Sequence, residues 1–308
     1  MSLLRSAFIA LSGNTLLRRM VERSTPGRRM SARFVAGFRI EDAMSAAATL
    51  HRQGFAITLD SLGENVSTAS QARQAAQIYH WLLDAIAPSS LHANVSLKLT
   101  QMGMDLDPAL AFENVAGLVR HAAATKNFVR VDMEGTAYTQ ATLDLVRRLH
   151  AEPANRDHVG VVIQAYLRRS ADDVAALMKD GIRVRLCKGA YKEPPSLAFP
   201  DKKDVDANYV ALTKMLLKSG IFHGIATHDP AMIAATKEFA RAERIDPSAF
   251  EFQMLYGIRR DLQRSLVQEG YGVRVYVPFG DEWYPYFMRR LAERPANVLF
   301  LARNLLRK

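Results

Sequence analysis

The feature that most constrains the fold is a regular alternation of β-rich runs and helical stretches. Segments with helical periodicity, such as "ADDVAALMKD", separate short runs that are almost continuously apolar. Such runs are typical of parallel strands that helices cover on both faces. There are eight of them, at residues 56–60, 92–99, 128–133, 159–166, 182–188, 224–228, 250–254 and 272–278.

Eight strand–helix units in succession predict an α/β fold, a (β/α)8 barrel of the TIM type with extra helices before the first strand. The alternative is a doubly wound sheet, which usually carries a G-x-G-x-x-G turn after its first strand, and this sequence lacks one. Closed barrels commonly use about 250 residues in a single domain. We therefore expect N-terminal helices over 1–53, packed on a catalytic barrel over 54–308, as one domain.

The net charge of +10 favours anionic partners, which include nucleic acid, an acidic membrane surface and a small anionic substrate. No zinc-finger spacing, RNP-like strand or lysine-rich tail supports nucleic-acid binding. No apolar run reaches the roughly 18 residues of a spanning helix. The first segment, "MSLLRSAFIALSGNTLLRRM", is amphipathic and rich in arginine. We expect it to pack on the domain, with a membrane-facing helix or a transit peptide as alternatives.

The single cysteine, Cys187, excludes an intrachain disulfide, a cysteine-ligated iron–sulfur cluster and a four-cysteine zinc site. It stands in the apolar run "IRVRLCKG", where a buried, inert thiol is expected rather than a nucleophile. This cysteine usage fits an intracellular protein.

Polar residues stand at the ends of the predicted strands, where the active site of a (β/α)8 barrel forms. Several are basic, which predicts a cationic mouth and an anionic ligand. Arg289 and Arg290 follow the last strand as an adjacent pair, and guanidinium groups bind carboxylates and phosphates in a two-pronged way. The alternative is a solvated helix face. The strand-end residues are Asp60, Lys98, Asp132, Glu134, Gln164, Arg185, Lys188, His228, Gln253 and Tyr276.

Three chemistries could use such a mouth. Lys98 or Lys188 could form a Schiff base as in an aldolase. Metal-assisted hydrolysis would need His228 and Asp132, but His223 and His228 are expected to point to opposite faces, and we expect no metal. A redox cofactor with phosphates would give several cations a role. Spacing alone leaves these alternatives open, together with a barrel that only binds an anion.

Eight motifs resemble the proline dehydrogenase family, which also forms one domain of the fused proline-utilization proteins. They follow in the family's order, from about residue 36 to the C-terminus, and the closest resemblance is to the monofunctional branch. "RLCKGAY" and "PYFMRRL" are highly specific together. The motifs are "TLDSLGENV", "VSLKLTQMG", "VRVDMEGTAYT", "VIQAYLRRS", "RVRLCKGAYKE", "IATHD", "EFQMLYG" and "RVYVPFGDEWYPYFMRRL".

The resemblance implies a distorted barrel that binds FAD non-covalently. It implies oxidation of L-proline to Δ1-pyrroline-5-carboxylate, the first step of proline catabolism, with electrons passed to a membrane quinone. The location implied is intracellular, either cytoplasmic or peripheral on the inner face of the membrane.

The resemblance also implies residue roles. Asp132, Arg185 and Tyr276 would be catalytic, and Glu64 would form a gate with one arginine of the pair. The substrate would be bound by Lys98, Leu255, Tyr276, Arg289 and Arg290. The cofactor would be bound by Ile163, Gln164, Arg185, Lys188, Gly189, Ala190, Thr227 and His228.

Overall fold

The structure is a computed structural model that describes residues 31–293, apart from the side chains of Arg289 and of residues 291–293. The expected helices before residue 31 therefore lie outside the described residues. None of the helices within the described part of the chain is long and apolar enough to cross a bilayer.

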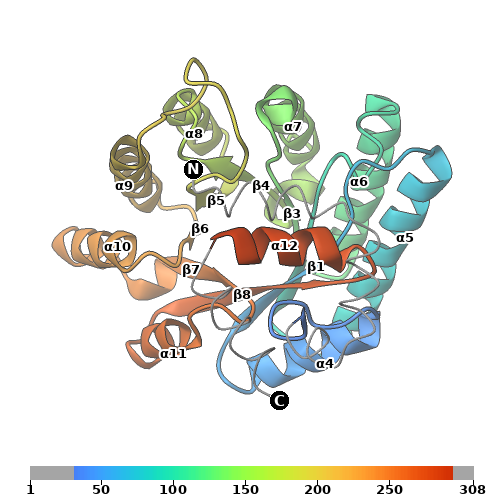
Figure 1. Cartoon of the computed structure of the whole chain (residues 1–308), viewed down its shortest axis with the longest axis horizontal. Helices are drawn as coiled ribbons and strands as arrows, with labels where there is room; N and C mark the ends of the chain where they lie inside the picture. Colours follow the sequence, from blue (N-terminus) through green and yellow to red (C-terminus); the bar gives the residue numbers. More distant parts are fainter. Residues whose placement is uncertain (1–30, 294–308) are drawn as a thin grey trace, which may run out of the picture.

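Eight parallel strands form a closed barrel in chain order, with β1 paired to both β2 and β8 (Figure 1). The predicted barrel is confirmed, and the doubly wound alternative is wrong because such a sheet has two open edges. Each predicted run overlaps one strand. The strands are β1 Ala56–Ser61, β2 Ala93–Leu97, β3 Val129–Val131, β4 Val159–Gln164, β5 Arg183–Cys187, β6 His223–Ala226, β7 Phe250–Leu255 and β8 Gly272–Phe279.

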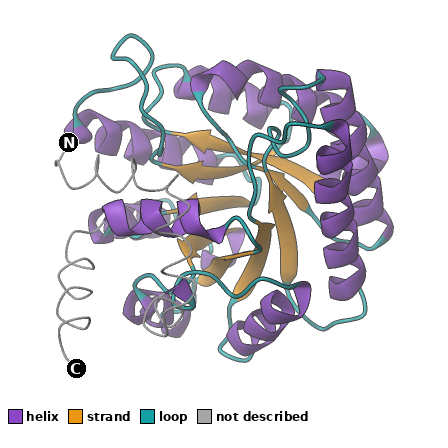
Figure 2. Cartoon of the chain, turned by 45° about the vertical axis from the view of Figure 1, so that its right-hand side comes forward, coloured by secondary structure: helices purple, strands orange, loops and turns teal. Residues whose placement is uncertain are grey.

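Helices surround the strands (Figure 2). Local sequence explains several of their starts: Asp107 and Asp229 each accept a backbone N–H of the first turn, and a proline follows each of them. The helices are α4 Ile40–His51, α5 Ala69–Ile86, α6 Pro108–Ala124, α7 Thr136–His150, α8 Ser170–Lys179, α9 Lys202–Lys218, α10 Pro230–Ala242, α11 Arg260–Gln268 and α12 Trp283–Glu293, with short 3-10 helices η1 Pro153–His158 and η2 Pro247–Ala249.

The barrel departs from a regular one at its closure. Helix α4 packs beside β8 and β1 and buries Ala43, Ala47 and Leu50 in the main core. Helix α12 follows β8 but crosses in front of the strand ends (Figure 1). Thus α4 fills the outer position that the last helix of a regular barrel would take. Helix α4 contributes to the core of the barrel. The predicted boundary at residue 53 therefore divides the sequence and not the core, and the domain assignment stays a prediction.

A second, smaller apolar cluster holds α12 in place. It joins α12 to residues 34–35, to the loop after β1 and to the loop after β7. Burial of large aromatic side chains stabilises such a contact by about 1.5–3 kcal/mol each. The cluster therefore positions the segment that carries the arginine pair. Its members are Phe34, Val35, Leu62, Ile258, Trp283, Tyr284, Tyr286, Phe287 and Met288.

Candidate active site

Asp132 is the centre of a hydrogen-bonded cluster at the carboxyl ends of the strands, which we call the mouth. It follows β3 directly, and its Oδ1 accepts from Ser96 Oγ at 2.7 Å and from Arg185 Nη1 at 2.9 Å. Its Oδ2 accepts from the Tyr276 hydroxyl at 2.9 Å. The structure thus brings together Asp132, Arg185 and Tyr276, the three residues expected to be catalytic.

Tyr276 lies half-buried in β8, and the guanidinium carbon of Arg185 is 5.3 Å from its ring centroid. Burial, together with the negative charges of Asp132 and Asp60, raises the pKa of Tyr276 well above its ordinary value. The phenol therefore stays protonated and donates its hydrogen bond.

Lys98 follows β2, and its Nζ is 3.3 Å from Oδ2 of Asp60, a fully buried residue at the end of β1. Burial alone would lower the pKa of Lys98, but the charges of Asp60, Asp132 and Glu64 outweigh it and raise the pKa. Lys98 is therefore an ammonium at neutral pH. Asp60 is held in turn by the Tyr79 hydroxyl, 3.1 Å away.

The cations of the strand ends are neutralised, which differs from the expected cationic mouth. Lys98 pairs with Asp60, and Arg185 pairs with Asp132. Lys188 bonds to two further aspartates, Asp206 of α9 and Asp229 at the start of α10. Excess positive charge for an anionic substrate must come from elsewhere, and α12 carries the remaining expected cations.

Leu255, the expected wall of the substrate site, ends β7 and packs against the α12 cluster. Arg290 lies on α12 with its guanidinium carbon 5.0 Å from the Tyr286 ring centroid. The backbone of Arg289 is one residue earlier on the same helix, and its side chain is outside the described atoms. The pair is thus carried by a helix that crosses the mouth.

The residues expected to bind cofactor lie at three neighbouring strands. Ile163 and Gln164 end β4, residues 188–190 follow β5, and residues 227–228 follow β6. Of the residues expected to bind substrate, Lys98 follows β2, Leu255 ends β7, Tyr276 lies in β8, and the arginine pair lies in α12. The two sets occupy different arcs of one mouth.

The loop after β5 contains a glycine that its backbone conformation and its packing on Tyr166 require. Gly189 has φ +120°, and a Cβ there would lie 2.2 Å from the ring of Tyr166. The next residue, Ala190, is exposed and donates its N–H to Gln164 Oε1 at 3.2 Å. Gln164 Nε2 donates to the Glu134 carbonyl at 2.8 Å, so this amide fixes the loop.

The loop after β6 presents a histidine of defined tautomer. The backbone N–H of Leu255 donates to His228 Nε2 at 2.8 Å, which puts the ring proton on Nδ1. Thr227 Oγ1 accepts the N–H of Asp229 at 3.0 Å. A glycine-walled loop and an imidazole donor at adjacent strand ends fit the polar part of a flavin cofactor. Lys188 fits less well, because two aspartates already bind its ammonium.

Sequence reasoning missed two residues of this site and gave a third no role. Ser96 and Tyr191 were missed: Ser96 accepts from Arg185 inside the barrel, and Tyr191 lies among the charges of Glu64, Glu134 and Lys98. Gln253 was expected at a strand end without a role, and it also accepts from Arg185. Alternation along β2 places Ser96 on the same face as Lys98, and this was the available signal. Cys187 is half-buried rather than fully buried as expected, and burial raises its pKa to about 12, which agrees with the expected inert thiol.

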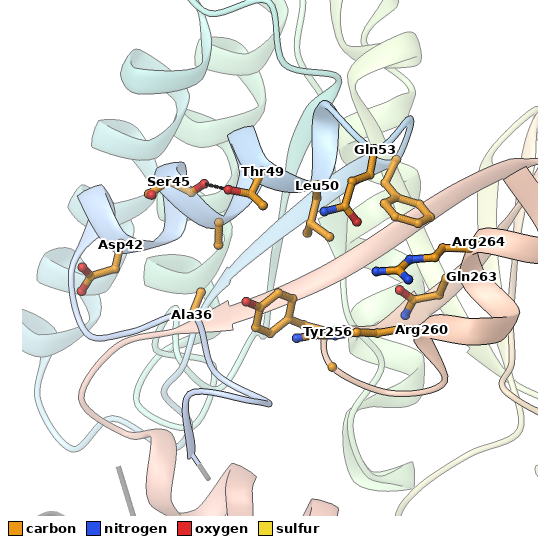
Figure 3. A pocket seen from close by; sticks show the side chains of 13 residues that line it. Ala36, Asp42, Ser45, Thr49, Leu50, Gln53, Tyr256, Arg260, Gln263 and Arg264 are labelled. Carbon is orange, nitrogen blue, oxygen red and sulfur yellow. Dashed lines mark hydrogen bonds between the residues drawn. The ribbon is translucent and has the colours of Figure 1, made fainter. Parts of the chain in front are cut away.

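A cavity of about 370 Å³ lies between α4 and α11, away from the mouth (Figure 3). Tyr256 and Gly257, which follow Leu255, form part of its wall, and Arg260 and Arg264 of α11 line another part. None of the residues expected to form the site lines it. The cavity therefore does not mark the substrate site.

Comparison with known proteins assigns a family. The model of the proline dehydrogenase family matches residues 43–303. "Proline dehydrogenase 1" of Bacillus subtilis is 41% identical over 307 residues, which cover 99% of this chain and 100% of that protein. "Proline dehydrogenase" of Deinococcus radiodurans is 42% identical over 281 residues, which cover 90% of each protein.

Larger proteins contain a similar region. "Bifunctional protein PutA" of Escherichia coli is 28% identical over 337 residues, and 96% of this chain matches 25% of that protein. The crystal structure of proline utilization A from Bdellovibrio bacteriovorus inactivated by N-propargylglycine superposes with a TM-score of 0.81 at 27% identity, over 87% of this chain and 33% of that chain. The same barrel therefore occurs as one part of those proteins.

Proposed function

Since the chain belongs to the proline dehydrogenase family and oxidises proline, we propose that it does so with non-covalently bound FAD. We further propose that the product is Δ1-pyrroline-5-carboxylate and that a membrane quinone takes the electrons. The observation that best supports this proposal is the buried cluster in which Asp132 accepts hydrogen bonds from Arg185, Ser96 and Tyr276.

When bound, FAD would supply the acceptor for a hydride from C5 of proline, while the amine gives its proton to water and the C5=N bond forms. The task of this chain's residues is to hold C5 within about 3–3.5 Å of the acceptor. In our proposal Lys98, Arg289 and Arg290 bind the proline carboxylate. Tyr276 and Leu255 form apolar walls on either side of the ring.

The remaining residues of the mouth orient these groups. Asp132 holds Arg185 and Tyr276 in fixed positions, which supports a catalytic role for all three. Glu64 is close enough to influence the pKa of Lys98, which is compatible with the proposed gate at the mouth. We assign Glu64 to contact with an arginine of α12 when substrate is bound.

For the cofactor we propose contacts with Ile163, with the backbone of residues 188–190, and with Thr227 and His228. Gln164 and Lys188 have hydrogen bonds within the protein, which favours a role in shaping the loops around the cofactor. Arg185 would lie beside the reacting edge of the flavin.

The Schiff-base alternative is disfavoured by charge. A nucleophilic lysine must lose its proton, but the neighbouring carboxylates raise the pKa of Lys98 despite the opposing effect of burial. Borohydride treatment in the presence of substrate should leave Lys98 unmodified. A barrel that only binds an anion would show no turnover at all.

The quinone acceptor suggests peripheral contact with an anionic membrane, for which the net charge of +10 is favourable. The amphipathic N-terminal segment, for which a membrane-facing helix was one alternative, lies outside the described residues. Flotation with vesicles that contain anionic lipid should carry the protein at low salt and release it at high salt. Flotation that is equal at both salt concentrations, or absent at low salt, contradicts electrostatic binding.

The proposed reaction is tested by product formation. Purified protein, L-proline and a water-soluble quinone should yield Δ1-pyrroline-5-carboxylate, which o-aminobenzaldehyde traps as a coloured adduct. Extraction of the same sample should release one FAD per chain without proteolysis. Product formation without extractable flavin would contradict the cofactor assignment.

A further inference from the structure

A line of buried hydrogen bonds runs from the mouth into the barrel below Arg185. Arg185 Nε donates to Gln253 Oε1, and Gln253 Nε2 donates to Glu251 Oε1 at 2.7 Å. Glu251 also accepts from Arg274 Nε at 2.6 Å, and Arg274 Nη1 donates to the Ile57 carbonyl at 2.7 Å. Gln253 is 5% exposed and Glu251 is 6% exposed. Burial at this depth makes each unmade hydrogen bond costly.

The charge of Glu251 sets the direction of this line. Its carboxylate, paired with Arg274, can only accept hydrogen bonds, so the NH2 group of Gln253 must face it. The amide oxygen of Gln253 must then face Arg185, where it accepts Nε–H. Glu251 thus acts on Arg185 through the orientation of one amide.

Two anchors on different edges fix the plane of the Arg185 guanidinium. Asp132 and Ser96 accept from Nη1 at 2.9 and 3.2 Å, while Gln253 accepts from Nε; Thr58 Oγ1, 3.5 Å from Nη2, is a weaker contact. An ion pair with Asp132 alone would let the planar group turn about that contact. The second anchor removes this freedom.

A glycine on the neighbouring strand makes room for the anchor. Gly224 of β6 pairs with Glu251 in the sheet, and a Cβ at Gly224 would lie 2.2 Å from Gln253 Nε2. That atom belongs to a buried side chain whose amide is held at both ends, so it has little room to move. The space around Gln253 therefore depends on this glycine.

We propose that Gln253, oriented by Glu251, is the positioning residue that fixes the Arg185 guanidinium for proline oxidation. The inference rests on the proposed function, because Arg185 is placed beside the reacting groups. Gln253 itself touches neither substrate nor cofactor in this account. The carboxylate-binding residues of α12 are not part of this line, so the turnover number should suffer and substrate affinity should not.

The first test separates turnover from binding. Gln253→Leu should lower kcat by about tenfold to a hundredfold, the scale of a misplaced catalytic group. Its KM for proline should stay within about threefold, since substrate contacts remain. Glu251→Gln should give the same pattern, because an amide at residue 251 allows the Gln253 amide to rotate by 180° and exchange its oxygen and nitrogen. Gln253→Met, closer in shape, replaces the leucine variant if that variant does not fold.

The second test uses the direction of the hydrogen bonds. Gln253→Glu places two carboxylates against each other, and adding Glu251→Gln restores one donor and one acceptor at that contact. The double variant should recover kcat by about tenfold over Gln253→Glu alone. A role in packing alone predicts no such recovery. The control is Asn155→Leu, which removes a buried amide bonded to the Leu149 carbonyl far from the mouth. This control should lose stability but keep kcat.

The third test does not depend on turnover. In protein labelled with 15N-arginine, the Nε–H of Arg185, assigned with Arg185→Lys, should exchange slowly with water. It should exchange rapidly in Gln253→Leu. A slow signal that persists in this variant, or an unchanged kcat once the signal is lost, overturns the proposal. If the parent protein does not oxidise proline, the proposed function fails while the exchange data still report on the anchor.

Discussion

Aspartates fix the charge and the orientation of the basic residues of the mouth. Asp60 binds Lys98, and Asp132 binds Arg185, so both of these cations have a charged partner. Pairing of this kind keeps a buried charge ionised and fixes its direction. In the proposed site, a substrate carboxylate would therefore meet oriented cations rather than a diffuse positive surface, and it would depend on α12 for additional charge.

Replacing either arginine of α12 tests that dependence. Arg289→Met or Arg290→Met should lower kcat/KM for proline, with a loss of transition-state stabilisation of about 2–4 kcal/mol, because a charged hydrogen bond is lost from a desolvated site. Lysine replacements should recover part of the loss, since an ammonium lacks the planar fork. Flavin content, measured by absorbance, should be unchanged. Losses below about 0.5 kcal/mol, or about twofold, would make the pair ordinary surface charge.

Asp60→Asn tests the charge state of Lys98. With its nearest carboxylate removed, burial is less strongly opposed and the pKa of Lys98 should fall. The ammonium would then be lost as pH rises through the lowered pKa, so KM for proline should rise at alkaline pH in the variant only. Glu64→Gln is the matched control and should shift the profile less. Identical pH profiles for Asp60→Asn and the parent protein would rule out this coupling.

At the scale of elements, the alternation of strands and helices could be predicted from the sequence, because short apolar runs alternate with segments in which apolar residues recur with helical periodicity. Every predicted strand was found, with ends displaced by at most a few residues, as for 128–133 against β3 Val129–Val131. The resemblance supplied the expected site residues, and the structure joins three of them, since Asp132 accepts from both Arg185 and Tyr276.

Other features could not be read from local pattern because they depend on register between distant strands. The pairing of Lys98 with Asp60 requires β1 beside β2, and the line through Gln253 requires β5, β7 and β8 together. For this reason the sequence did not reveal that aspartates neutralise the cations at the strand ends. The position of α4 beside β8 could be inferred only from the structure, because it depends on α12 crossing the strand ends instead of packing on the outside of the barrel.

The loop after β5 gives a prediction for cofactor binding. Gly189→Ala should weaken FAD binding by tenfold or more, because its φ of +120° disfavours a side chain and the new Cβ would collide with Tyr166. Gly270 is a matched control, since its φ is +87° and nothing lies within 4 Å of a Cβ there. Gly270→Ala should cost about 1 kcal/mol of stability and leave the dissociation constant of FAD unchanged. Equal FAD affinity in both variants would remove this loop from the cofactor site.

At the scale of the whole molecule, a buried histidine links stability to pH. His223 accepts the N–H of Val184 at 3.0 Å, and burial, with the charges of Arg130 and Arg183, lowers its pKa to about 3. The unfolded chain binds this proton near pH 6.5, whereas the folded chain does not. The folded state is therefore favoured above pH 6.5, and its free energy of unfolding falls by up to about 1.4 kcal/mol per unit as pH drops toward 3.

Urea unfolding at pH 7.5, 6.5 and 5.5 measures this effect. His223→Gln should be less stable at pH 7.5, but its free energy of unfolding should fall less steeply between pH 6.5 and 5.5, by about 1 kcal/mol. Parallel pH dependence in the variant and the parent would show that His223 does not carry the effect.

Anaerobic reduction tests most directly whether the mouth holds proline against a flavin. Purified protein saturated with FAD and freed of oxygen should lose its visible flavin absorbance when L-proline is added, and a quinone should restore it. Arg290→Met should need a higher proline concentration for the same loss. A flavin-saturated protein whose absorbance persists at saturating L-proline would contradict the account.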